Sequence, residues 1–150
     1  FFQTENHRLL KDREFLILKP NGGNSSEEEY FIKEAASSIT QPISMEMEKI
    51  DATGFELKGS PATVALDFDK LQFPLKLRRW KKGDKFVPLG MKGAKKLSDY
   101  FVDRKFSRFQ KEQVWLLCSE DDIVWIVNER LNDRYKLSNT TKTIYFARLY

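Results

Sequence analysis

Short apolar segments separated by turn-forming residues are the feature of this sequence that most restricts its fold. Apolar and polar side chains alternate up to Met47 in the segment 43–50 and again in 63–68, and the segment 29–34 is of comparable length. Alternation with a period of two is typical of half-buried strands, and turn signals at Gly54 and Pro61 separate the segments. The first seventy residues therefore predict a meander of short strands.

Two hairpins are predicted, one near each end of the chain. Apolar residues at 9–10 and 15–18 flank a short charged turn. The apolar runs 114–118 and 123–127 are joined by an acidic turn, which is a strong hairpin signal, and 143–150 is predicted to be a last strand.

The period of the pattern changes in the middle of the chain. Leu75 and Leu77 alternate with basic residues on a predicted strand, and 82–84 is a predicted turn. One face of an amphipathic helix is then predicted at spacings i, i+3, i+4 and i+7, formed by Leu97, Tyr100, Phe101 and Arg104. A second helical stretch is predicted from 107 to about 113. We expect an α+β fold that is mainly antiparallel β, sandwich-like, with one or two short helices.

Basic residues are concentrated in residues 76–111, which we name the basic segment. It holds thirteen of the 26 Lys and Arg but only three of the 22 Asp and Glu, so the rest of the chain is net acidic although the whole carries +4. Aromatic residues lie among these charges, and Tyr100 and Phe101 are expected to pack on the apolar helix face. A basic zone that contains aromatics is typical of a surface that contacts nucleic-acid phosphates, whereas an ordinary solvated surface mixes both signs.

The residues expected to contact phosphate lie before, at and after the predicted helix start. Backbone N–H groups at that start, with the lysines beside them, would attract one phosphate. The full set is Arg78, Arg79, Lys81, Lys82, Lys85, Lys92, Lys95, Lys96, Arg104, Lys105, Arg108 and Lys111.

Metal binding and nucleophilic catalysis find little support in the sequence. With one histidine, His7, and one cysteine, Cys118, a single chain cannot assemble a Cys/His metal site or a Ser-His-Asp triad. We expect Cys118 in the core and His7 on the surface. The carboxylate pairs at 67/69 and 121/122 are assigned to solvated turns.

Two glycine-bearing loops are candidate phosphate cradles. Residues 21–26 lack the leading Ser and the Asp of a pyrophosphatase loop, and a plain hairpin loop is the preferred interpretation. Residues 90–98 lead into the helix, but their Gly-x-x-Gly-x-Lys-Lys spacing does not fit a P-loop. We therefore expect no catalytic and no metal-binding residues in this chain.

The sequence lacks the signals of membrane insertion and export, which limits the expected cellular location. Nothing approaches the roughly 20 consecutive apolar residues that cross a bilayer, and no signal peptide is recognisable. A single cysteine excludes an internal disulfide. We expect a soluble cytoplasmic protein with no membrane partner. Because the sequence begins at Phe1 in mid-pattern, we expect a piece of a longer chain.

Residues 78–93, RRWKKGDKFVPLGMKG, followed by KKLSDYF at 95–101 and by Asp103, closely resemble the C-terminal domain of bacterial tRNA(Ile)-lysidine synthetases. The resemblance continues in IVWI at 123–126 and RLNDRY at 130–135. It implies that residues 73–150 form that domain and residues 1–72 a β-rich linking region of the parent enzyme, with one shared core as the alternative.

Those parent enzymes use ATP to join lysine to the wobble cytidine of an isoleucine tRNA, forming a carbon–nitrogen bond. Their chemistry belongs to an N-terminal catalytic domain, whose Ser-Gly-Gly-x-Asp-Ser loop is missing from this sequence. The resemblance thus implies no enzyme activity and no cofactor for this chain alone, ATP and lysine being used by the catalytic domain. It implies tRNA(Ile) and that catalytic domain as partners, with the acceptor-stem side of the tRNA gripped here.

Lys95 and Lys96 match the Lys-Lys of the family and are implied tRNA contacts. Two positions depart from the family pattern: Asn128 stands where Gly is usual, and Asn132 where Asp is usual. Asn tolerates a left-handed backbone, so the turn at 128 can survive, whereas the change at 132 removes a carboxylate that Asp133 could replace. The alternative function is a scaffold or homodimerisation module of the same enzyme, seated on the hairpin of Trp115 and Trp125.

Overall fold

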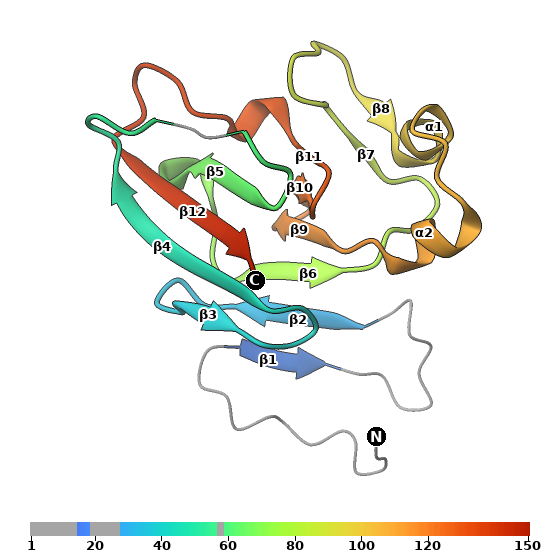
Figure 1. Cartoon of the computed structure of the whole chain (residues 1–150), viewed down its shortest axis with the longest axis horizontal. Helices are drawn as coiled ribbons and strands as arrows, with labels where there is room; N and C mark the ends of the chain where they lie inside the picture. Colours follow the sequence, from blue (N-terminus) through green and yellow to red (C-terminus); the bar gives the residue numbers. More distant parts are fainter. Residues whose placement is uncertain (1–14, 19–27, 57–58) are drawn as a thin grey trace.

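The computed structural model describes residues 15–18, 28–56 and 59–150. Among them, the larger sheet has six strands, each antiparallel to its neighbours (Figure 1). In spatial order these are β1 (Phe15–Leu18), β2 (Glu29–Ile32), β6 (Leu75–Arg78), β9 (Leu116–Ser119), β10 (Asp122–Ile126) and β11 (Arg130–Leu131).

A second sheet lies beside it, and the remaining elements connect or cover the two. Its strands, also antiparallel, are in spatial order β3 (Ser38–Ile39), β4 (Met45–Asp51), β12 (Thr143–Leu149) and β5 (Thr63–Asp67). The other elements are the ribbon β7 (Lys85–Phe86) and β8 (Lys95–Lys96), the helices α1 (Leu97–Asp103) and α2 (Arg108–Gln113), and the 3-10 turns η3 (Phe68–Lys70) and η4 (Asp133–Tyr135). The predicted fold class, mainly antiparallel β with short helices, is confirmed.

The main hydrophobic core contains residues of both sheets. Leu77 of β6 and Trp125 of β10 belong to the same buried cluster as Met47 of β4, Leu66 of β5 and Tyr145 of β12. The period-two pattern explains this arrangement, because in β4 Met45 and Met47 are buried while the intervening residue is not.

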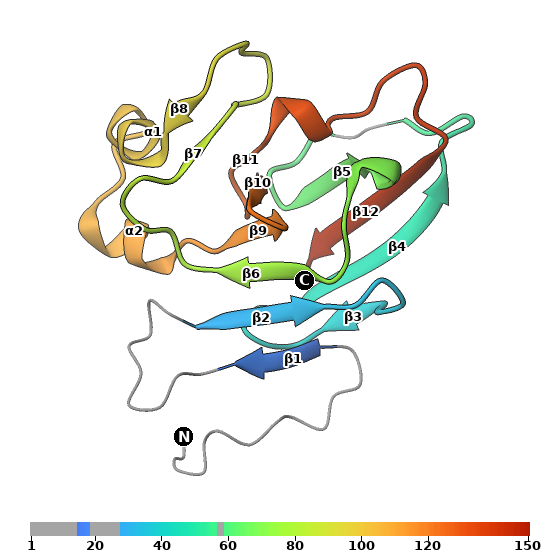
Figure 2. The ribbon, with the colours of Figure 1, turned by 180° about the vertical axis from the view of Figure 1, so that it is seen from behind.

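A second cluster packs on the other side of the larger sheet. Leu116 and Ile126 of β9 and β10 meet Phe86 of β7 and the buried Leu97 and Phe101 of α1. Strands β9 and β10 are therefore covered by apolar residues on both faces, which explains their nearly continuous apolar sequence. Figures 1 and 2 show β7, β8, α1 and α2 gathered at one end of the molecule, away from β4 and β12.

Most elements predicted from the sequence are present. Strands occur within or close to the predicted segments 29–34, 43–50, 63–68, 75–79, 114–118, 123–127 and 143–150, and both predicted helices form. The prediction that 9–10 pairs with 15–18 and the loop prediction at 21–26 lie outside the described residues, as does His7. Within the structure, β1 pairs with β2.

Three local predictions need correction. Lys95 and Lys96 form β8 and precede the helix rather than starting it. Asp67 is buried and caps η3 instead of lying in a solvated turn. Trp115 and Trp125 are 7% and 1% exposed, so the hairpin proposed as a dimer seat already packs both tryptophans into the protein's own core.

Strands from the two predicted halves of the chain pair with each other. β2 is the neighbour of β6, and β12 lies between β4 and β5. The division at residue 72 stays a prediction, because strand pairing does not define a family boundary.

Candidate nucleic-acid interface

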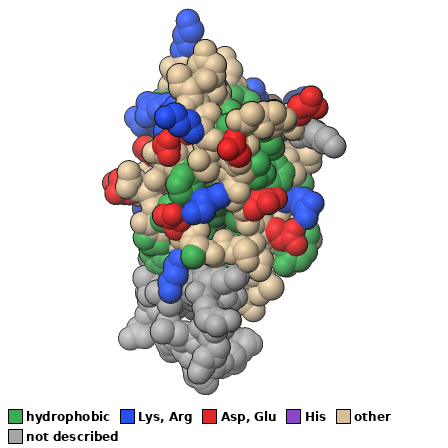
Figure 3. All heavy atoms as spheres, turned by 90° about the vertical axis from the view of Figure 1, so that its left-hand side faces the viewer, with side chains coloured by type: hydrophobic (Ala, Val, Ile, Leu, Met, Phe, Trp, Pro, Cys, Tyr) green, Lys and Arg blue, Asp and Glu red, His purple; other side chains and the backbone are tan. Residues whose placement is uncertain are grey.

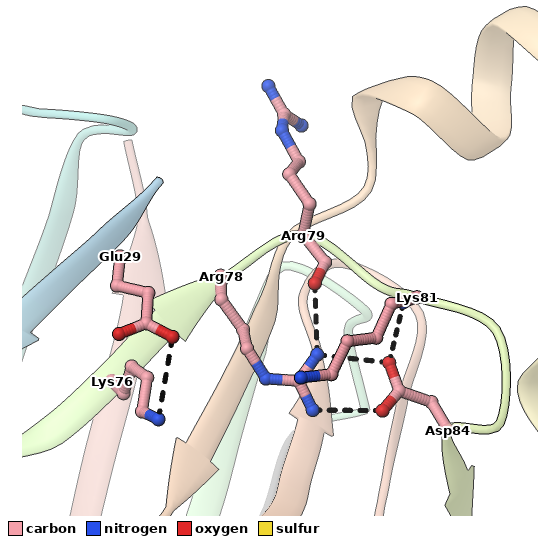
Figure 4. A network of polar contacts seen from close by, with 6 residues as sticks. All are labelled: Glu29, Lys76, Arg78, Arg79, Lys81 and Asp84. Atoms are coloured by element: carbon pink, nitrogen blue, oxygen red, sulfur yellow. Dashed lines mark hydrogen bonds and ion pairs between the residues drawn. The ribbon is translucent and has the colours of Figure 1, made fainter. Parts of the chain in front are cut away.

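A buried ion pair holds the first turn of the basic segment (Figure 4). Arg78 donates to both carboxylate oxygens of Asp84 at 3.0 Å, and the two side chains are only 11% and 9% exposed. The same carboxylate accepts a hydrogen bond from the backbone N–H of Lys81 at 2.7 Å. Gly83 completes the turn at φ +96°, a conformation that side chains rarely adopt. Arg78 and Asp84 thus form a clamp across the turn.

The surroundings of the clamp favour the charged form of Arg78. Burial acts to lower the pKa of Arg78, but the hydrogen bonds and charge of Asp84 outweigh it and raise the pKa above its ordinary value. Arg78 Nη1 also donates to the carbonyl of Arg79 at 2.9 Å. The Arg78 guanidinium is therefore engaged inside the protein.

Arg79 points away from the clamp in Figure 4. Its guanidinium lies over the ring of Trp115, 3.8 Å from the centroid, and donates to the Val114 carbonyl at 3.4 Å. Burial lowers the pKa of Arg79. This side chain covers the end of the main core and is only partly accessible to a ligand.

The ribbon β7–β8 presents lysines on facing strands. Lys85 is the direct cross-strand partner of Lys96, and Phe86 is that of Lys95. The buried Phe86 ring packs edge-on against Tyr100 at 5.5 Å, which anchors the ribbon to α1. Like charges directly opposite each other on two strands repel, so this pair is unfavourable until an anion approaches.

The ends of the ribbon are tied to other elements. Lys95 pairs with Asp103 of α1. A hydrogen bond of 3.0 Å from the N–H of Gly90 to the Asp133 carboxylate fixes the loop that carries exposed Lys92. Gly90 adopts φ +89° there. The first N–H of the helix, that of Leu97, donates to the Asp84 carbonyl at 2.9 Å. One backbone donor expected to bind phosphate at the helix start therefore already has a partner.

The last part of the basic segment, from residue 104 to 111, connects α1 to α2 and forms most of α2. Arg104 donates to Glu129 at 3.2 Å, and Tyr100 donates to the same carboxylate at 3.0 Å. Burial, with the Glu129 charge, raises the pKa of Tyr100 to about 12. α2 begins with a capping box in which Ser107 and Gln110 satisfy each other's backbone N–H groups.

The twelve predicted contact residues thus fall into two groups. Within the described residues, four have partners inside the protein: Arg78, Arg79, Lys95 and Arg104. The side chains of the other eight show neither an ion pair nor a hydrogen bond to any described residue, and we name them the free basic set: Lys81, Lys82, Lys85, Lys92, Lys96, Lys105, Arg108 and Lys111. Seven are exposed and Lys111 is half-buried.

The free basic set belongs to the end of the molecule formed by the ribbon, the two helices and their connections, the yellow-green to orange region in Figures 1 and 2. The side of the molecule away from that end is different. Figure 3 shows acidic and basic side chains scattered there among hydrophobic ones. The structure therefore keeps the charge asymmetry that the sequence predicts.

Other polar groups of interest have structural partners. Cys118 is buried, and burial raises its pKa to about 11, so the prediction that it packs in the core is confirmed. Asp67 accepts from the Thr141 hydroxyl at 3.1 Å, and Asp122 from the Tyr135 hydroxyl at 2.6 Å. Across the described part of the chain, no group of three or more His, Cys, Asp or Glu residues is placed to hold a metal ion.

The two departures from the family pattern have clear local roles. Asn128 adopts φ +66°, so the prediction of a left-handed turn residue is confirmed. Asn132 is buried, donates to the Ile123 carbonyl at 2.8 Å and accepts from the Arg134 N–H at 2.9 Å. It therefore caps η4 with its amide, while Asp133 binds the Gly90 loop.

No helix in the part of the chain described by the structure has the length and apolar character needed to cross a membrane. The fold and the basic end together define a class: a β-rich, sandwich-like domain whose outer layer of ribbon and helices carries unneutralised cations. Residues 75–147 match the model of the TilS substrate C-terminal domain. These residues belong to that family.

Curated relatives agree with this assignment. The chain is 46% identical over 145 residues to a tRNA(Ile)-lysidine synthase of Parabacteroides distasonis, covering 95% of this chain and 33% of the relative. It is 34% identical over 148 residues to the enzyme of the same name from Bacteroides thetaiotaomicron, covering 99% and 32%. The chain thus spans about a third of the length of these relatives.

A solved structure confirms the fold. The crystal structure of a TILS C-terminal domain superposes with a TM-score of 0.66 at 17% identity, covering 80% of this chain and 95% of that one. At this identity the similarity concerns the fold alone.

Proposed function

We propose that this chain is the tRNA-gripping C-terminal region of a tRNA(Ile)-lysidine synthetase. It holds the acceptor-stem side of tRNA(Ile) through backbone phosphates, in the cytoplasm. The parent enzyme is a ligase that attaches lysine to the wobble cytidine, and its catalytic domain, a partner of this region, uses the ATP and the lysine. This region supplies binding and no catalytic group.

The observation that carries the proposal is the free basic set. Eight cations without a partner among the described residues are gathered at one end, and two of them, Lys85 and Lys96, face each other across a ribbon. An A-form stem exposes phosphates and 2′-hydroxyls while its deep groove hides the base edges. Rows of Lys and Arg on a firm β platform suit that target, since they bind the backbone with little dependence on sequence.

Charge reversal on the ribbon tests the proposal. The double variant Lys85→Glu, Lys96→Glu is expected to weaken tRNA(Ile) binding by at least tenfold, because two attractive phosphate contacts become repulsive. Fluorescence anisotropy with labelled tRNA measures the change. The matched control is Lys142→Glu, an exposed lysine just before β12 that should leave the affinity within twofold. Equal affinities for the double variant and the control would refute the assignment. Lys95 is left intact because its replacement would also break the pair with Asp103.

A scaffold or dimerisation module is the second candidate. The observation that favours it is apolar exposure: Val102 and Phe109 are 69% and 68% exposed. Light scattering beside tRNA titration separates the two candidates. A dimer that resists salt, together with no measurable tRNA affinity, would support the scaffold.

A further inference from the structure

A groove with a volume of about 590 Å³ runs beside α2. Its lining is largely apolar and includes Val114, Trp115 and Val127, with Leu149 of β12 beside them. Two charged residues also line it, Arg104 and Glu129, and they form an ion pair with each other at 3.2 Å. A volume of this size falls in the range of sites that hold small organic groups.

Phe109 stands at this groove with its ring largely in solvent. It is 68% exposed, whereas neighbouring Phe106 is partly buried, stacked on Phe101 at 5.1 Å and packed against the second cluster. Packing in the protein accounts for an aromatic residue at position 106 but not at position 109. An exposed aromatic ring does not contribute the free energy that its burial would give.

Amide side chains line the same groove beside the ring. Gln110 lines the groove and uses its carbonyl oxygen to accept from the Ser107 N–H at 2.7 Å, so its NH₂ group is not used in that cap. Gln113 also lines the groove, and its amide can both donate and accept hydrogen bonds. An aromatic face with amides beside it offers both stacking and hydrogen bonding to a planar heterocycle.

Cations of the free basic set lie on α2 and just before it, outside the groove's own lining, and favour a polyanion beside the groove. Arg108 and Lys111 lie on the same helix as Phe109, and Lys105 lies just before it; all three belong to the free basic set. The groove and this part of the proposed phosphate-binding surface thus share helix α2. An apolar protein segment would not be expected to require three adjacent cations.

We propose that this groove takes an unpaired nucleobase of RNA, stacked on Phe109 with its edge toward Gln110 and Gln113. The inference rests on the proposed function, because the free basic set must hold the adjoining phosphates. RNA-binding proteins commonly recognise splayed-out bases by aromatic stacking and by hydrogen bonds to base edges, while paired regions are read by shape. Within the same interface, the groove would therefore separate RNA with an unpaired nucleotide from a closed duplex.

The experiment compares two RNA hairpins with the same stem, one blunt and one with a short single-stranded 3′ extension that carries 2-aminopurine. The extended RNA is expected to bind the chain about tenfold more tightly, in the range of one stacked base. Phe109→Ala should remove that preference and leave the affinity for the blunt hairpin unchanged, while Phe109→Trp should retain it. Quenching of aminopurine should follow the same order. Val102→Ala, an equally exposed apolar residue that does not line the groove, is the control.

The remaining outcomes overturn the inference in distinguishable ways. Equal binding of both hairpins by the unmodified chain would exclude a base site and leave the phosphate interface standing. Equal loss of both hairpins in Phe109→Ala would make the ring a general contact. Failure to bind either RNA would refute the proposed function together with the groove. A dimer that Phe109→Ala dissociates would assign the groove to a second copy of the chain.

Discussion

At the scale of single residues, Arg78 sets the geometry of the basic segment without belonging to its free charges. Its guanidinium binds both oxygens of Asp84, and that carboxylate also holds the N–H of Lys81. The main-chain oxygen of Asp84 accepts from Leu97 at the helix start. Strand β6, the turn and α1 are therefore linked through one acidic residue.

Removing one partner of this clamp should be costly. Arg78→Ala is expected to lower the free energy of unfolding by about 3 kcal/mol, because it leaves a nearly buried carboxylate without its counter-charge. Asp84→Ala should cost at least as much, since the Lys81 N–H also loses its acceptor. Urea denaturation measures both, with exposed Lys82→Ala as a control expected within about 0.5 kcal/mol of the parent. A loss below about 1 kcal/mol for Arg78→Ala would show that water readily replaces the ion pair.

Predictions for single residues succeed where the role of the residue depends on its own backbone conformation. They fail where the role depends on a contact with a residue distant in sequence. The left-handed turn at Asn128 follows from the conformational tolerance of Asn, and φ +66° confirms it. The capping role of Asn132 depends on the Ile123 carbonyl reaching its amide from another strand. Likewise, a list of basic residues does not reveal that Arg78 and Lys95 are neutralised by Asp84 and Asp103.

At the scale of elements, the ribbon β7–β8 carries an arrangement of charges that suits the proposed phosphate binding but disfavours strand pairing. Lys85 faces Lys96 directly, and directly opposed like charges destabilise a strand pair. The ribbon remains in place because Phe86 is buried against Tyr100 and because Leu97 is fastened to Asp84. Its exposed edge is thus free to carry charges that do not help the fold.

Lys96→Glu should therefore stabilise the protein while weakening its contact with RNA. A cross-strand pair of opposite charges contributes roughly 0.2–1 kcal/mol, so thermal unfolding at low ionic strength should shift upward. The gain should shrink in high salt, because exposed charges are screened. Lys92→Glu in the adjoining loop serves as the control, since Lys92 has no cross-strand partner in the described ribbon. An unchanged or lower melting temperature for Lys96→Glu in low salt would contradict this account.

The elements themselves could be predicted from local pattern, but their partners could not. The alternation of apolar and polar residues predicts β4 and β5 as separate strands, and the helical spacing of apolar residues predicts α1. Nothing local indicates that β12 inserts between β4 and β5, because that pairing joins residues far apart in sequence. The sequence does not predict β8, because two residues are too few to show a period and adjoin the apolar pattern of α1.

At the scale of the whole molecule, the residues that build the hydrophobic core and the residues that carry the free positive charge lie in different parts of the fold. The two sheets build the main core, and the second cluster holds the ribbon and α1 on the far side of the larger sheet. Acidic residues elsewhere keep the total at +4 although the basic segment is strongly cationic. Under the proposed function, such an arrangement would orient a polyanion toward one end without the self-repulsion of a uniformly basic protein.

Salt dependence is the whole-molecule test of this arrangement. Each phosphate contact contributes roughly −0.7 to −0.9 to the slope of log affinity against log salt, so engagement of the whole free basic set gives a slope of about −6 to −7. Titration of tRNA(Ile) over a range of potassium chloride concentrations measures it. Lys96→Glu should reduce the magnitude by about one, and Lys142→Glu should leave it unchanged. Because the slope counts released counterions and is independent of sequence preference, a value shallower than about −2 would mean that most of these cations remain solvated in the complex.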